Sequence, residues 1–180
     1  MVILHAGSGV PDPERKRLHP RYRGPEWEEI CVDLDPNVKP DIVANITDLS
    51  PIADESVDVA WCYHVLEHMH AHEVPVALSE LRRVLVKDGK LEVSVPDLQA
   101  VGEMLAAGDL EERIYMAPVG PVSPIDMIYG LRPAIELGGD LMTHKTGFVD
   151  RTLCEAITHA GFRVECRREL FQLIAEAWRQ

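Results

Sequence analysis

Short apolar runs alternate along the chain with stretches that repeat at helical spacing. Apolar, β-branched runs predict strands over residues 1–5, 29–33 and 41–45. Residues 57–63, "VDVAWCY", are apolar at nearly every position, which is typical of a strand buried on both faces of a parallel sheet. Residues 91–95 predict a further strand. Together these runs indicate a sheet of mainly parallel strands.

Two helices are predicted between and after these strands. The first covers residues 73–86 and ends at the sequence "KDGK". The second covers residues 150–160, with Asp150 as its cap and Gly161 just past its last turn. Two closing runs follow, "FRVECRRE" and "LFQLIAEAWRQ", the second with mixed strand and helix character. The apolar stripe expected on the first helix consists of Val76, Leu78, Leu81, Val84 and Leu85.

Strands that alternate with helices predict an α/β fold, in which ligands bind beyond the carboxyl ends of the strands. Four prolines, at positions 11, 13, 20 and 25, prevent a long helix between the first two strands. We expect one domain over residues 1–180, within the usual size of a domain. The irregular segment 100–149 is expected to form a lid on it.

The balance of charged residues indicates which classes of binding partner are unfavourable. The formal net charge of −12 disfavours nonspecific binding to nucleic acid and to anionic membranes. A basic island inside the proline-rich stretch is either a solvated loop that balances the acidic surface or an anion-binding site. The island consists of Arg15, Lys16, Arg17, Arg21 and Arg23.

The four cysteines, at positions 31, 62, 154 and 166, stand singly. Without a Cys-x-x-Cys pair, they suggest neither a zinc site nor a disulfide framework. No apolar run approaches the roughly 20 residues of a membrane-spanning helix, and the N-terminus lacks the features of a secretory signal. We therefore expect a cytoplasmic protein with reduced thiols.

Candidate binding chemistry gathers where the first two predicted strands end. Gly7 and Gly9 lack a Cβ, so the backbone there can bend sharply and approach a ligand closely. Asp33 ends the next strand, and its carboxylate can accept hydrogen bonds from both vicinal hydroxyls of a ribose, a role that Asp35 could share. Since "VPDP" follows Gly9 in place of a helix start, the site offers a poor seat for a pyrophosphate. A nucleoside cofactor without phosphates, such as S-adenosylmethionine, fits better.

Five stretches extend this pattern over nearly the whole chain. They resemble the class I S-adenosylmethionine-dependent methyltransferases, and within them a short group in which a loop replaces the first helix. The resemblance implies an α/β, Rossmann-like sheet with helices on both faces. Three residues depart from the usual motifs. His5 stands where the family usually has Asp or Asn, and Pro11 stands in place of a third glycine. Asn45 occupies the position usually held by an acid after the third strand. The stretches are "LHAGSG", "CVDLDP", "ANITDLSPIADESVDVAWCYHVLEHM", "ELRRVLVKDGKLEVSVPDL" and "IYG…HKTGFVDRTLCEAITHAGF".

The resemblance also implies the cofactor, S-adenosylmethionine, its product S-adenosylhomocysteine, and the residues that hold them. Gly7 and Gly9 would line the methionine part, Asp33 would bind the ribose, and Leu34 would pack on the adenine. Core packing for Leu34 and turn capping for Asp48 remain the alternatives. The other residues expected at the cofactor are His5, Asn45, Ile46, Asp48, Tyr63 and His64.

The run "YHVLEHMHAHE" holds four histidines and two glutamates. His64 and His68 stand four apart, as two metal ligands on a helix would. Because the sequence defines no third ligand, we expect no metal and assign the cluster to the lining of the cofactor site. A histidine titrates near neutral pH, so His64 is a candidate catalytic base.

The loop "MTHKTGF" supplies further candidates, because the resemblance places it near the mouth of the active site. His144 is the second candidate catalytic residue, and His144, Lys145 and Tyr129 are expected to contact the substrate. A cation there would hold a carboxylate or phosphate, or instead satisfy backbone carbonyls.

These observations predict a methyltransferase that moves a methyl group from S-adenosylmethionine to oxygen or nitrogen of a small molecule by direct displacement. The alternatives are a module that binds the cofactor without methyl transfer and a nicotinamide-dependent oxidoreductase, with a metal-dependent hydrolase ranked below both. The expected partner is a small-molecule substrate, without nucleic acid or membrane, and a homodimer is left open.

Overall fold

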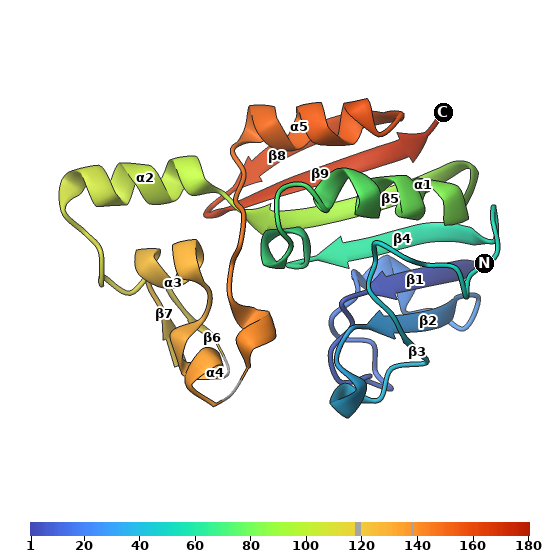
Figure 1. The fold of residues 1–180 in the computed structure, drawn as a ribbon, viewed down its shortest axis with the longest axis horizontal. Coiled ribbons are helices and arrows are strands. Elements are labelled where there is room, and N and C mark those ends of the chain that lie inside the picture. The colour runs from blue at the N-terminus through green and yellow to red at the C-terminus, as the bar shows by residue number, and fades with distance from the viewer. Residues whose placement is uncertain (118–119, 138) are drawn as a thin grey trace.

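The computed structural model describes residues 1–117, 120–137 and 139–180. Its main element is a seven-stranded sheet of order β3-β2-β1-β4-β5-β9-β8 (Figure 1). The first five strands pair in parallel, whereas β9 is antiparallel to both β5 and β8. The carboxyl ends of β1, β2 and β4 therefore meet at one edge, where the strand order reverses. The strands are β1 (Val2–Ala6), β2 (Glu28–Asp33), β3 (Ile42–Val43), β4 (Val57–Tyr63), β5 (Leu85–Pro96), β8 (Phe162–Glu169) and β9 (Gln172–Arg179).

Helices α1 (Val74–Val84) and α5 (Asp150–His159) cover one face of this sheet (Figure 1). The buried stripe of α1 begins at Val74, one helical turn before Leu78. The predicted stripe was wrong at Val76, whose side chain is 48% exposed, because the side of α1 that faces the sheet is fixed by positions 74, 78 and 81.

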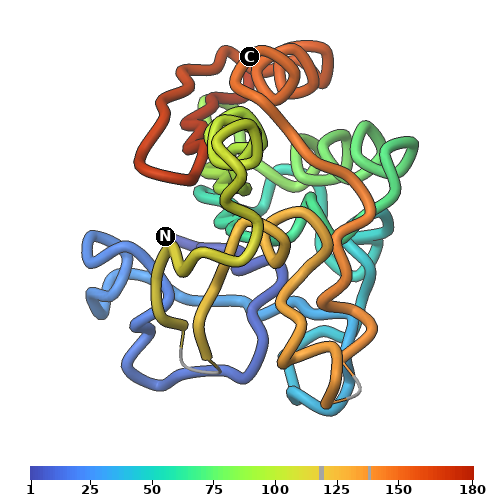
Figure 2. The backbone as a smooth tube through the Cα atoms, turned by 90° about the vertical axis from the view of Figure 1, so that its left-hand side faces the viewer, coloured from blue at the N-terminus to red at the C-terminus, as the bar shows by residue number. Residues whose placement is uncertain are grey.

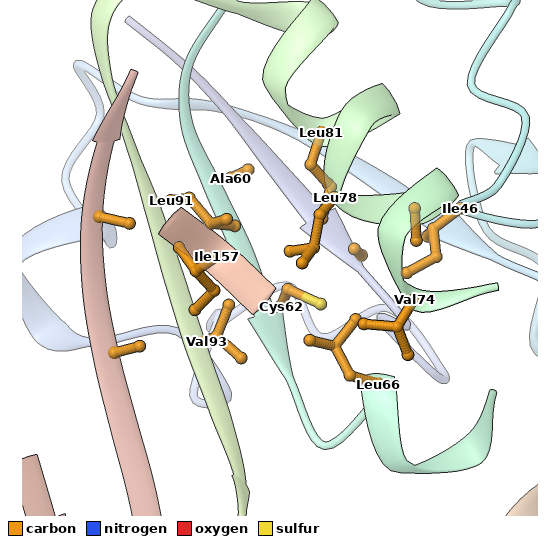
Figure 3. Packing of buried hydrophobic residues seen from close by; sticks show 14 of the residues in the cluster. Ile46, Ala60, Cys62, Leu66, Val74, Leu78, Leu81, Leu91, Val93 and Ile157 are labelled. Atoms are coloured by element: carbon orange, nitrogen blue, oxygen red, sulfur yellow. The ribbon is translucent and has the colours of Figure 1, made fainter. Parts of the chain in front are cut away.

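The core lies between these two helices and the central strands. Figure 3 shows Leu78 and Leu81 of α1 close to Ala60 and Cys62 of β4, with Ile157 of α5 beside β5. All five side chains are fully buried. Burial of such side chains contributes about 1.5–3 kcal/mol for each large one, so this layer fixes the strands whose ends carry the site.

The opposite face is covered by residues 10–27, which form only a 3-10 turn, η1 (Pro20–Tyr22). In this segment Leu18, Tyr22 and Trp27 belong to a second apolar cluster, which includes Trp61 of β4. The prediction that a loop replaces the first helix is therefore confirmed. Helices on both faces were expected, but among the described residues only α1 and α5 pack on the sheet in this way, since the prolines prevent a helix here.

The arginines of the basic island hold this loop to the sheet. Arg15 donates to Trp27 O at 2.8 Å and forms an ion pair with Glu29 at 3.2 Å. Arg23 donates to the carbonyl oxygen of Leu18 at 2.7 Å. Arg21 contacts the buried carboxylate of Glu92 on β5. These three arginines therefore donate to acceptors of the loop and the sheet, in a segment without helical hydrogen bonds.

Segment 98–142 projects beyond the carboxyl ends of the strands. Figure 2 looks at that end of the molecule, where the yellow and orange segment faces the viewer. Its small sheet, β6 with β7, packs with its helices around a separate apolar cluster that includes Val101, Val122 and Met127. Its elements are α2 (Leu98–Ala107), β6 (Tyr115–Ala117), β7 (Gly120–Val122), α3 (Pro124–Tyr129), α4 (Arg132–Glu136) and η4 (Asp140–Met142).

The cysteines divide into two groups. Cys31 and Cys62 are buried free thiols, as their apolar surroundings suggested. Cys154 of α5 and Cys166 of β8 form a disulfide, with Cα atoms 6.5 Å apart. The expectation of no disulfide was wrong because the packing of α5 on β8 brings together cysteines that share no sequence motif.

Hydropathy along the described helices bears on membrane insertion. None of the helices in the described ranges is both long enough and apolar enough to span a lipid bilayer.

Candidate functional site

The turn that follows β1 favours glycine at two positions. Gly7 and Gly9 have φ of 64° and 60°, in the left-handed region that side chains with a Cβ rarely adopt. A Cβ on Gly7 would collide with Val65, and one on Gly9 with the guanidinium of Arg17. Arg17 itself donates to Ser8 O at 2.5 Å, which holds its guanidinium against the turn.

Asp33, at the end of β2, is bonded to this turn. Its Oδ2 accepts from the amide of Gly9 at 2.7 Å, and its Oδ1 accepts from the amide of Asp35 at 2.9 Å. Each carboxylate oxygen can accept a second hydrogen bond, so the group can still receive ligand hydroxyls. The next side chain, Leu34, is 48% exposed, which excludes the alternative that it belongs to the core.

The segment after β3 lies beside this acid, since the amide of Ala44 donates to Asp33 O at 3.0 Å. Asn45 accepts from the amide of Thr47 at 3.1 Å, and Ile46 is buried. Asp48 is exposed and accepts from the amide of Ser50, and these hydrogen bonds lower the pKa of Asp48. Asp48 thus caps a turn in this structure.

His5 and Tyr63, two of the residues predicted at the cofactor, contact other side chains of the protein. His5 is 6% exposed and its Nδ1 lies 2.8 Å from Glu29; burial lowers its pKa despite that carboxylate. Tyr63 stacks on Trp61 with ring centroids 3.6 Å apart, and burial raises its pKa to about 12. The structure therefore does not bring these rings together with Gly7, Gly9 and Asp33 through any contact of the described residues.

His64 follows β4 in a left-handed conformation, with φ of 56°. Its amide donates to Ser94 O at 2.8 Å, and its Nδ1 lies 3.0 Å from Oε1 of Glu67. Glu67, in η3 (Leu66–His68), is 1% exposed. Sequence reasoning did not single out Glu67, although a carboxylate between Leu66 and His68 in the turn "VLEHM" was the available signal.

A cavity of about 140 Å³ lies between η3 and segment 115–144. His144, one of the predicted substrate residues, lines it. Tyr129 and Lys145 are exposed and bond nearby through their backbones: Tyr129 O accepts from His144 N at 3.1 Å, and Lys145 N donates to Glu67 O at 2.8 Å. The lining residues are His64, Glu67, His68, Pro96, Tyr115, Ala117, Val122, Asp126, Met127, Leu131, Met142 and His144.

Comparison with known families agrees with this arrangement of strands. Residues 15–93 match the model of a family described as a methyltransferase domain. The matched stretch is less than half of the chain and contains the ribose-acid candidate Asp33 and the cavity histidine His64. This stretch of the chain is therefore similar to the methyltransferase domain. Among curated proteins, none matches the sequence.

Solved structures show the same methyltransferase fold at low sequence identity. The 1,6-didemethyltoxoflavin N1-methyltransferase of Burkholderia thailandensis, solved with 1,6-didemethyltoxoflavin and S-adenosylhomocysteine, is 16% identical with a TM-score of 0.61. The alignment covers 99% of this chain and 71% of that one. A methyltransferase from Archaeoglobus fulgidus is 14% identical, with a TM-score of 0.62 over 99% of this chain and 86% of that one. These similarities confirm the predicted Rossmann-like methyltransferase fold.

Proposed function

We propose that this domain transfers a methyl group from S-adenosylmethionine to an oxygen or nitrogen atom of a small molecule. The observation that carries the proposal is the hydrogen bond from the Gly9 amide to Asp33, which joins a glycine turn to a ribose-binding acid. The Burkholderia methyltransferase, which was solved with S-adenosylhomocysteine and a small molecule, has the same fold and supports the choice of ligands.

The residues at the strand ends fit such a cofactor. Gly7 and Gly9 offer close backbone approach to the methionine part, and Asp33 keeps acceptor capacity for two ribose hydroxyls. The exposed Leu34 offers an apolar surface for the adenine, and Asn45 is proposed to contact the adenine edge. S-adenosylmethionine, when bound, supplies a methyl group already activated on its sulfonium, so the protein has mainly to align the acceptor and exclude water.

His64 is the proposed base for an acceptor hydroxyl or amine. Its Nδ1 is engaged with Glu67 Oε1, which accepts a hydrogen bond from the protonated Nδ1 and leaves the lone pair on Nε2. Glu67 thereby positions the ring and stabilises its charged form once Nε2 has taken the proton. His144 is the second candidate, because it lines the same cavity.

Segment 100–149 is proposed as the lid of this site. It contributes the far wall of the cavity through residues such as Tyr115 and Met127. Lys145 and Tyr129, which are exposed beside it, are proposed to contact the acceptor at the mouth. A cavity of about 140 Å³ suits a small acceptor group.

A thermal-shift panel with S-adenosylhomocysteine, NAD and ATP tests the proposal, followed by a screen for methyl transfer to small alcohols, phenols and amines. Stabilisation by S-adenosylhomocysteine and transfer to an acceptor are expected. Stabilisation by NAD without any effect of S-adenosylhomocysteine would favour an oxidoreductase instead. Tight binding of S-adenosylhomocysteine without transfer to any acceptor would identify a binding module.

A further inference from the structure

We propose that Glu67, His68 and His144 bind a divalent transition-metal ion at the wall of the acceptor cavity. The proposal deepens the proposed function, because the ion would face the cavity assigned to the acceptor, but the ligands are argued from their own geometry. One potential ligand atom from each residue lies within 4.8 Å of those from the other two. Side-chain rotations that move these atoms by about 1 Å bring them to the metal–ligand distances of about 2.0–2.2 Å found for zinc.

The hydrogen bonds of the two histidines leave Nε2 of each ring available as a metal ligand. Nδ1 of His68 lies 3.3 Å from Thr143 O, and Nδ1 of His144 lies 2.9 Å from Met127 O. A carbonyl oxygen only accepts, so each Nδ1 carries the hydrogen and each neutral ring keeps its lone pair on Nε2. A histidine that donates its other N–H to a backbone carbonyl is the usual form of a protein metal ligand. The two rings meet edge to face, with centroids 4.8 Å apart.

Glu67 supplies a negative charge that the described residues leave incompletely paired. Oε1 contacts His64, but Oε2 is buried without a hydrogen-bond partner among the described residues. Burial of a carboxylate oxygen without a partner is unfavourable in free energy. Binding of a cation in the adjoining space would offset this cost. No lysine or arginine is among the described residues that line the cavity, and the other carboxylate there, Asp126, is already paired with Arg132.

The backbone holds the three ligands together before any ion binds. The amides of Lys145 and Thr146 donate to Glu67 O at 2.8 and 3.2 Å, which fixes the loop of His144 against η3. The sequence predicted no metal because it defined no third ligand beside His64 and His68. The third ligand comes instead from a loop far along the chain, and His64 uses its Nδ1 to contact Glu67.

Two imidazoles and one carboxylate form a donor set that suits zinc, iron, cobalt or manganese in the divalent state. Three protein ligands leave coordination positions open, and these would face the cavity. An ion there would ligate a hydroxyl or carboxylate oxygen of the acceptor and favour loss of a hydroxyl proton. The acceptor class implied is therefore an oxygen-bearing chelator rather than a simple amine.

Calorimetric titration with ZnCl₂ on untagged protein tests the site, together with the visible absorption of the Co²⁺ complex. The wild type is expected to bind one ion per chain. His68→Ala, His144→Ala and the conservative Glu67→Gln are each expected to weaken binding at least about tenfold. The matched control is the double variant His70→Ala, His72→Ala, which removes two exposed histidines outside the cavity and is expected to bind like the wild type.

Titration of each variant with S-adenosylhomocysteine shows whether it is folded and separates the two proposals. Zinc binding without S-adenosylhomocysteine binding would overturn the proposed function and leave the metal site standing. A wild type without a zinc site, three variants that bind zinc like the wild type, or a Co²⁺ spectrum unchanged from the aqueous ion would overturn the metal site. Glu67→Gln preserves side-chain volume, so it decides the matter if an alanine variant fails to fold.

Discussion

The amide of Gly9 donates a 2.7 Å hydrogen bond to Oδ2 of Asp33, and this bond joins the end of β1 to the end of β2. Two features that stand far apart in the sequence, a glycine turn and an acid, thus form one surface. Because this bond uses only one acceptor site of Oδ2, the Asp33 carboxylate can still accept hydrogen bonds from a bound ribose.

Asp33→Ala is expected to raise the dissociation constant of S-adenosylhomocysteine at least about tenfold. The variant loses two hydrogen bonds from the ribose to a charged group, each worth about 1.5–3 kcal/mol. Calorimetric titration measures the effect. Asp88→Ala, an exposed aspartate in the bulge of β5, is the control and should bind like the wild type. Equal affinities in the two variants would remove Asp33 from the site.

Gly7→Ala is expected to lower the free energy of unfolding by about 1–3 kcal/mol, because a Cβ at φ of 64° is strained and would collide with Val65. Urea unfolding monitored by circular dichroism measures the change. Gly102→Ala is the matched control: a Cβ there meets no atom within 4 Å in α2, and the change should stabilise by up to about 1 kcal/mol. A neutral Gly7→Ala would show that the turn does not need a glycine.

His64→Ala is expected to slow methyl transfer by about 10²–10⁴-fold, the usual contribution of a general base. The affinity for S-adenosylhomocysteine should stay within about threefold, since Asp33 and the glycine turn remain. Single-turnover kinetics with the acceptor found in the screen provide the measurement, and the exposed His72→Ala is the control. Unchanged turnover in His64→Ala would rule out this base.

Asp126 is expected to make the stability of the α3–α4 region depend on pH. Burial alone would raise the pKa of Asp126, but hydrogen bonds from Arg132 and Ser123 hold it at about 2, below its ordinary 3.8. A lowered pKa stabilises the folded state above the ordinary value, and the contribution disappears as pH falls through the folded value. The stability lost in Asp126→Asn should therefore be constant above about pH 4 and shrink toward pH 2, as measured by urea unfolding. A difference independent of pH would contradict the ion pair.

Local patterns predicted the strands well because each is a short apolar run. The predicted span of β4, residues 57–63, agrees with the structure. β5 proved longer than predicted: it pairs with β4 through Leu85 and again from Lys90, so "KDGK" contributes to a bulge rather than ending a helix. Strand β9 was ambiguous because its run "QLIAEAWR" shows no clear alternation of apolar and polar residues, and its pairing with β5 and β8 has no local sequence signal.

Side-chain clusters formed by distant segments were harder to predict. The glycine turn and Asp33 could be paired from the sequence, since parallel strands end at one edge. The approach of His144 to Glu67 depends on backbone hydrogen bonds between the loop and η3, which have no sequence signature. The Cys154–Cys166 disulfide was missed because it depends on the packing of α5 on β8, which also has no sequence signature.

The decisive measurement is the structure of a complex with S-adenosylhomocysteine. We expect both ribose hydroxyls within hydrogen-bond distance of the Asp33 carboxylate and the adenine against Leu34, with the sulfur toward the cavity beside His64. A ligand bound elsewhere, or a ribose without contact to Asp33, would contradict this expectation.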